Sequence, residues 1–137
     1  FTLTKDGKGQ GAILNQGGSP NGPGNPATPN SIISVFGTGQ GPTNPVVPDG
    51  QPAPSGGLAN TVAKPTTDLS ACLTQATLVC AAFGTEAAQV QYSGLAPGFV
   101  GLWQLNIQVP GDAPSGSVSL RIVIDQMLSN TITVSVK

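Results

Sequence analysis

The chain has no histidine among its 137 residues, and only 8% of its residues are charged. Without histidine, catalytic triads with an imidazole base and metal sites built on histidine ligands are excluded. Five lysine and arginine residues stand against six aspartate and glutamate residues. Because no basic stripe can form, we expect no nucleic acid and no anionic membrane surface as a partner. No apolar run is long enough to cross a bilayer, so we expect no membrane span.

Glycine and proline are abundant, with 19 and 13 residues respectively. They cluster between short apolar runs, which indicates turns and loops and argues against general disorder. A chain of this length forms one domain, residues 1–137, and can bury roughly two-thirds of its unfolded surface. The sequence begins at Phe1 without an initiator methionine, so we expect a processed or trimmed N-terminus.

Short runs of alternating apolar and polar residues predict strands. The clearest are "SVSLRIVID" and "TITVSVK", joined by "DQMLSN" as a hairpin loop, and the others are "SIISVFGTG", "AAQVQYSG" and "GLWQLNIQV". "ATLVCAAF" fits a strand or a helical turn, and "TTDLSACLTQAT" is the one plausible short helix. The pattern predicts an all-β sandwich of about seven to eight short strands. Residues 16–30 and 39–64 are too rich in proline for central strands and are expected to be long loops.

The two cysteines, Cys72 and Cys80, lie eight positions apart. A metal site would need more ligands than this segment offers. Two nearby cysteines in a chain poor in charge and methionine favour a disulfide formed in an oxidising compartment, and the alternative is two buried thiols. Because the closed loop is short, we expect the disulfide to contribute only about 2–3 kcal/mol to stability.

The acidic residues point to turns and not to a catalytic site. Asp6-Gly7, Asp49-Gly50 and Gly111-Asp112 are typical turn sequences. A glycosidase pair and a loop calcium site are the alternatives, but neither the spacing nor a ligand motif supports them. "DGKGQG" lacks the following helix of a phosphate-binding loop and is expected to be a hairpin turn. We therefore expect no catalytic residue, no metal and no cofactor.

Trp103 and Tyr92 are candidates for a sugar-stacking platform. Trp103 shares a strand face with Leu105 and Ile107, however, which favours packing in the core. Threonine and serine residues around "VAKPTTDLS" are candidate acceptors of O-linked glycans. Surface glycans are therefore candidate partners of this protein.

Several segments, in order, resemble the Solibacter-type C-terminal domain, a family found on large exported proteins of Acidobacteria. They are "GQGAILNQ", "NPATPNSIISVFGTGQGPTNPVVPDGQPAP", "VQYSGLAPGFVGLWQLNIQVP", "APSGSVSLRIVI" and "SNTITVSV". The resemblance implies an immunoglobulin-like β-sandwich that is extracellular or attached to the cell surface, usually at the end of a multi-domain protein. It implies no catalytic residues. The cysteine-containing segment "TTDLSACLTQATLVCAAFGTEA" replaces a shorter strand-turn-strand of the family.

The first 16 residues are expected to form a strand or hairpin that can be exchanged between subunits. The predicted subunit-contact strand consists of Phe1, Thr2, Leu3 and Thr4, which are uncharged and tethered by glycines. Burying Phe1 and Leu3 in a neighbour would contribute on the order of 3–6 kcal/mol before entropy costs. This segment suggests a non-enzymatic subunit of an extracellular filament or surface assembly, which polymerises by β-strand complementation.

The alternative is a passive immunoglobulin-like module of a larger exported protein. Such a module would serve as a spacer, an adhesion domain or a C-terminal anchor. In that case "FTLTK" and "GAILNQ" form a local hairpin within one chain.

Overall fold

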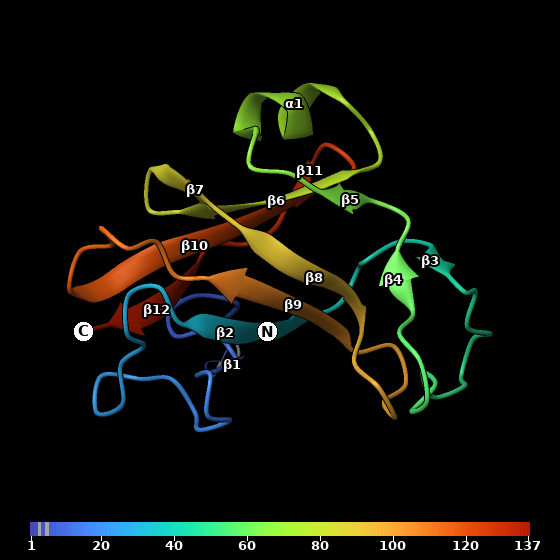
Figure 1. Cartoon of the computed structure of the whole chain (residues 1–137), viewed down its shortest axis with the longest axis horizontal. Coiled ribbons are helices and arrows are strands. Elements are labelled where there is room, and N and C mark those ends of the chain that lie inside the picture. Colours follow the sequence, from blue (N-terminus) through green and yellow to red (C-terminus); the bar gives the residue numbers. More distant parts are fainter. Residues whose placement is uncertain (3, 5) are drawn as a thin grey trace.

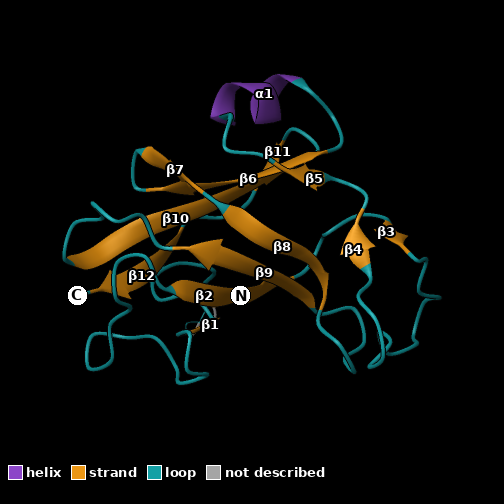
Figure 2. Ribbon diagram, in the orientation of Figure 1, coloured by secondary structure: helices purple, strands orange, loops and turns teal. Residues whose placement is uncertain are grey.

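The computed structural model describes residues 1–2, 4 and 6–137. Strands dominate it, and one short helix, α1 (Leu69–Thr74), lies on one side of the molecule, at the top of Figures 1 and 2. The strands of the described residues are β1 (Ile13–Leu14), β2 (Ile32–Gly37), β3 (Thr43–Asn44), β4 (Asn60–Thr61), β5 (Lys64–Pro65), β6 (Leu78–Phe83), β7 (Glu86–Ala88), β8 (Val90–Leu95), β9 (Trp103–Gln108), β10 (Gly116–Ile124), β11 (Met127–Leu128) and β12 (Ile132–Val136). The predicted all-β class is confirmed.

The strands form two sheets. The first has the order β1-β2-β9-β8-β4-β3, and each neighbouring pair in it is antiparallel. In the second sheet β10 is central, with β6 on one side and β11 and β12 on the other. The outer edge of β6 pairs with β7 and, in the parallel direction, with β5. The fold therefore has one antiparallel sheet and one mixed, mostly antiparallel sheet.

One hydrophobic core contains residues from both sheets. Alternate residues of β9, namely Trp103, Leu105 and Ile107, belong to it, as the period-2 pattern of this segment predicts. Trp103 is only 5% exposed, and its indole N–H donates to the Ser93 hydroxyl at 3.0 Å. The prediction that Trp103 packs in the core is confirmed, and it is not a surface platform for a sugar.

The strands expected from alternation are present as β2, β8, β9, β10 and β12. The ambiguous "ATLVCAAF" contains β6, because residues 79–83 pair with β10. The expected short helix is α1. Of the twelve strands among the described residues, five have only two residues, which leaves seven of three or more. The short additional strands include β3 and β4 in the predicted loop 39–64, and β11 in the predicted hairpin loop "DQMLSN".

The two cysteines form the predicted disulfide, which joins α1 to β6. Both side chains are fully buried, and they pack with Val123 of β10 in a small cluster separate from the main core. Asp68 caps the helix, since its carboxylate accepts the Ala71 N–H at 2.9 Å. The disulfide therefore holds the helical segment against the second sheet.

The free edge of β12 is covered by the chain's own N-terminal half. Gly11 donates its N–H to the Thr133 carbonyl at 3.0 Å, and the Thr133 N–H donates to the Gly9 carbonyl at 2.7 Å. Further along, the Asn21 side chain pairs with Ser135, whose N–H donates to Oδ1 and whose carbonyl accepts from Nδ2, both at 2.9 Å. The predicted loop 16–30 therefore covers a sheet edge.

Candidate functional site: the groove beside the N-terminal segment

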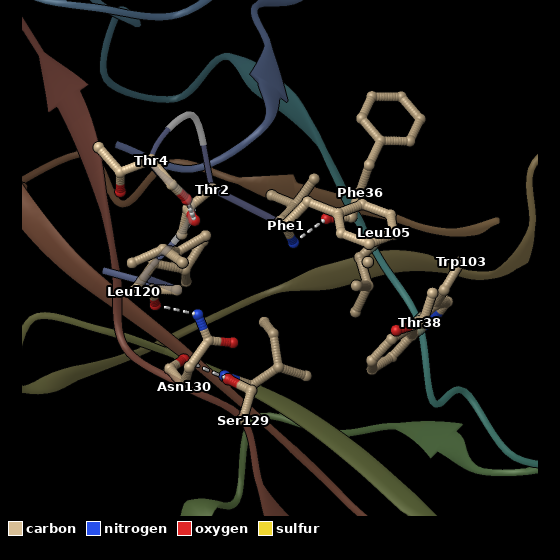
Figure 3. A pocket seen from close by; sticks show the side chains of 15 residues that line it. Phe1, Thr2, Thr4, Phe36, Thr38, Trp103, Leu105, Leu120, Ser129 and Asn130 are labelled. Atoms are coloured by element: carbon tan, nitrogen blue, oxygen red, sulfur yellow. Dashed lines mark hydrogen bonds between the residues drawn. The ribbon is translucent and has the colours of Figure 1, made fainter. Parts of the chain in front are cut away.

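The first residues of the chain pair within the same molecule. The Phe1 carbonyl accepts the Ala12 N–H at 3.0 Å, and Thr2 forms an antiparallel bridge with Gly11. The Phe1 amino group donates to the Phe36 carbonyl of β2 at 2.8 Å (Figure 3). These bonds place the N-terminal residues at the β1–β2 edge of the first sheet.

The structure places three of the four predicted contact residues, Phe1, Thr2 and Thr4, around one pocket. The fourth, Leu3, lies outside the described residues. The Phe1 side chain is 52% exposed, so it contacts the pocket without being enclosed by it. Burial of Phe1 by another subunit stays a prediction.

The pocket has a volume of about 440 Å³ and opens between the two sheets (Figure 3). A second pocket of about 150 Å³ shares Thr38, Trp103, Ile122 and Ser129 with it. We call the two together the edge groove. It is lined by Phe1, Thr2, Thr4, Gly7, Val35, Phe36, Gly37, Thr38, Gly39, Trp103, Leu105, Leu120, Ile122, Ile124, Met127, Leu128, Ser129, Asn130 and Ile132.

The edge groove has an apolar floor, and hydroxyl groups lie around it. Its floor includes Leu105 and Leu120, one from each sheet, whereas Thr38 and Ser129 supply hydroxyl groups. Not one of the lining residues named above carries a charged side chain. An extended peptide with apolar side chains suits such a groove, because a charged side chain on its apolar floor would lose hydration without gaining a partner. The one charge beside the groove is the Phe1 amino group, which donates to the Phe36 carbonyl.

A turn connects the N-terminal residues to the segment on β12. The Asp6 carboxylate accepts the Thr4 hydroxyl at 2.7 Å and the Lys8 N–H at 3.1 Å, and these bonds lower the pKa of Asp6. Gly7 and Gly9 have φ angles of +72° and +80°, which glycine adopts without strain. The predicted hairpin turn is confirmed: the segment leads into the two-residue strand β1 and not into a helix.

The remaining acidic residues do not gather into a site. Asp49-Gly50 and Gly111-Asp112 lie in turns, as predicted. In the part of the chain that the structure describes, no three residues among His, Cys, Asp and Glu lie close enough to hold a metal ion. No helix of the described residues has the length and apolar character needed to span a bilayer.

The sequence predicted that Phe1 needs an apolar groove, but it did not identify the residues that line it. The groove lies between two sheets whose separation no local pattern encodes.

A second surface was also missed, the outer face of β2, β9 and β8. The signal for it was present, because the alternation that buries Trp103 and Leu105 places Gln104 and Asn106 on the opposite face.

Comparisons with protein-family models, with curated proteins and with solved structures find no match. The resemblance to the Solibacter-type C-terminal domain therefore stays an expectation. The functional conclusions below depend on the geometry of the chain itself.

Proposed function

We propose that this chain is a non-enzymatic structural module of an extracellular filament or surface assembly, with an immunoglobulin-like β-sandwich fold. Subunits associate when the N-terminal segment of one copy pairs with the β1–β2 edge and the edge groove of another. The segment is the predicted contact strand, which begins at Phe1 and ends at Thr4.

The observation that carries this proposal is the pairing of Phe1 within one chain. Phe1 bonds to Ala12 and Phe36 beside an apolar groove. A contact that a segment makes within its own chain is available, unchanged, to the same segment of a second copy. The turn around Gly7 and Gly9 is the natural hinge for such an exchange, because glycine tolerates both the turned and the extended backbone.

Composition and the disulfide support an extracellular place of action. The Cys72–Cys80 disulfide suits an oxidising compartment. The low content of charged residues allows identical subunits to pack with little electrostatic repulsion. The resemblance to a domain of exported proteins points the same way.

The alternative is a passive immunoglobulin-like spacer or adhesion module of a larger exported protein. The covered edge of β12 favours it, because the bonds of Gly11, Asn21 and Ala27 to this strand are all made within one chain. A sheet edge that is already paired does not recruit another strand. In this alternative the N-terminal hairpin stays closed.

Sedimentation velocity and negative-stain electron microscopy test the proposal. The chain 1–137 is expected to form dimers or longer polymers as its concentration rises, and the chain 6–137 is expected to stay monomeric. A peptide of the first eight residues, FTLTKDGK, should bind the chain that begins at residue 9. Such binding would show that the edge accepts the strand from another molecule.

Phe99→Ala is the matched control, because Phe99 is an exposed aromatic residue outside the edge groove. This variant should associate like the unmodified chain. A full chain that stays monomeric at every concentration, together with a peptide that does not bind, would rule out the exchange and favour the passive module.

A further inference from the structure

The outer face of the first sheet carries two aromatic rings with amide side chains between them. On β9, Gln104 and Asn106 point away from the core that their neighbours Trp103 and Leu105 form. Phe36 on β2 is the partner of Gln104, and Figure 3 shows its ring pointing away from the edge groove. The strands β2, β9 and β8 lie side by side in this sheet.

On the other side of β9, the ring of Tyr92 completes the row. Tyr92 pairs with Asn106, and Gly94 pairs with Gln104. The phenol end of Tyr92 lies directly over Gly94, where a Cβ atom would be 2.7 Å from the Tyr92 Cζ. The Tyr92 hydroxyl donates to the Leu95 carbonyl at 2.8 Å, which fixes the ring in place. Phe36, Gln104 and the Tyr92 ring therefore follow one another across three strands.

The amides of this row are ordered but still have hydrogen-bonding capacity. Gln104 Nε2 donates to Asn106 Oδ1 at 2.9 Å, and the Ser34 hydroxyl donates to the same oxygen at 3.1 Å. Gln104 Oε1 and Asn106 Nδ2 take part in none of the hydrogen bonds found among the described residues. One acceptor and one donor group therefore face solvent between the two rings.

The face is uncharged, and the side chains of the row are half-buried. None of the residues of β2, β8 and β9 carries a charge. The helix α1 packs on the other sheet, against β6 and β10, and no helix is drawn over β8 or β9 in Figure 1. A row of side chains that crosses three strands suits a polymer better than a small molecule, which needs a concave site. The lack of charge selects against phosphate, sulfate and nucleic acid.

We propose that this face binds an extended neutral glycan chain, with sugar rings stacked on Phe36 and Tyr92 and hydroxyl groups bonded to Gln104 and Asn106. The apolar C–H face of a pyranose ring packs on the negative face of an aromatic ring. Amides match sugar hydroxyls, because both groups donate and accept hydrogen bonds. This inference is independent of the exchange of the N-terminal segment.

The spacing of the two rings supports a chain of sugars over a single sugar. Phe36 and Gly94 lie on strands separated only by β9, so their Cα atoms are about 9–10 Å apart at the usual strand spacing. The Tyr92 ring lies over Gly94, so the two aromatic side chains stand on strands on either side of β9. A chain of sugars that crosses the three strands reaches both of them.

Titration of the 137-residue protein with cellohexaose and with chitohexaose tests the proposal by two-dimensional NMR. The side-chain amide signals of Gln104 and Asn106 should shift on addition of at least one of these glycans. Phe36→Ala and Gln104→Ala should each weaken binding about tenfold, the equivalent of about 1.4 kcal/mol. Phe36→Tyr should bind like the unmodified protein, because the ring is retained.

Phe99→Ala serves as the control, because Phe99 is an exposed aromatic residue in the loop between β8 and β9. It should leave the affinity unchanged, and the folded state of every variant is checked by its thermal unfolding. The proposal is overturned if neither glycan shifts the amide signals, or if Phe36→Ala and Gln104→Ala bind as tightly as the control. Shifts that depend on protein concentration alone would also overturn it, because a second copy would then cover this face.

Discussion

The side-chain amide of Asn21 pairs with Ser135 as the backbone of a neighbouring strand would. The Ser135 N–H donates to Asn21 Oδ1, and Asn21 Nδ2 donates to the Ser135 carbonyl, both at 2.9 Å. Asn21 is 4% exposed, and it also accepts a hydrogen bond from the Gln10 side chain. One amide therefore closes part of a sheet edge and joins the N-terminal segment to the last strand.

Replacing Asn21 is therefore expected to destabilise the protein. Asn21→Ala leaves the buried Ser135 N–H without its partner, and such a loss costs about 1–3 kcal/mol. Denaturant unfolding measures the change, and the exposed Gln51→Ala is the control, expected to change stability by less than about 0.5 kcal/mol. Equal stability of the two variants would show that water replaces the amide at no cost.

Gly7→Pro should favour the exchanged form over the closed hairpin. Proline fixes φ near about −65°, whereas Gly7 has a φ angle of +72° in the turn. The turn then opens, and the fraction of dimers and larger species in sedimentation velocity should rise. Gly50→Pro is the matched control, since Gly50 has a φ angle of +76° in a turn away from the edge groove. A monomeric Gly7→Pro variant would favour the passive module.

Gly94 should not tolerate even a methyl group. A Cβ atom at this position would lie 2.5 Å from the Ala59 carbonyl oxygen and would also collide with the Tyr92 hydroxyl. Because the backbone at Ala59 must move to make room, we expect Gly94→Ala to destabilise the protein by about 1–3 kcal/mol. Gly57→Ala is the control, because nothing lies within 4 Å of its Cβ position. Thermal unfolding of the two variants compares them directly, and a tolerated Gly94→Ala would show that β4 and β8 separate easily.

Removing the disulfide should loosen α1 but keep the two sheets together. The double variant Cys72→Ala/Cys80→Ala loses the closure of a short loop, worth about 2–3 kcal/mol. Neither cysteine belongs to the main core, so the circular dichroism of the strands should be retained. Amide hydrogen exchange should increase within residues 69–74 and not within β9. Loss of all strand signal would contradict this prediction and would show that the disulfide is needed for the whole fold.

The docking of Phe1 should depend on pH. Burial lowers the pKa of its amino group from 8.0, so the docked group binds its proton less tightly than the free one. Lowering the pH through the window below 8.0 therefore weakens docking, and docking is strongest above 8.0. The Gly37 amide signal should titrate with a midpoint below 8.0 in NMR spectra. The N-acetylated chain is the control and should show no such titration, whereas a midpoint at or above 8.0 would contradict the docked position.

The sequence predicted the elements that local periodicity determines. Alternation in β9 and β10 identified both their strand character and their buried faces. Apolar residues such as Trp103 and Leu120 stand at every second position, and every second side chain of a strand points to the same face. The two-residue strands β3 and β4 have no period to detect. They form because Asn60 of β4 pairs with Gly94 of β8, which is distant in the sequence, and β3 pairs with β4.

The candidate sites could be predicted only in part, for the same reason. The N-terminal segment was recognised from its own residues, but the edge groove combines side chains from opposite sheets, such as Leu105 and Leu120. The pairing of Asn21 with Ser135 spans 114 residues. Likewise, the row that begins at Phe36 depends on the register between β2 and β9. Hydrophobic patterning sets this register only when the two strands pair, and they are distant in the sequence.

The parallel pairing of residues 9–11 with β12 has a mechanical consequence. These two segments lie near opposite ends of the chain, and they run side by side in the same direction. A force that pulls the two ends apart would slide one segment along the other, so the bonds of Gly9 and Gly11 to Thr133 would bear the load together. Bonds loaded in shear break as a group and not one at a time. We therefore expect the domain to resist stretching along the chain, which is the direction of tension in a fibre or a surface-attached protein.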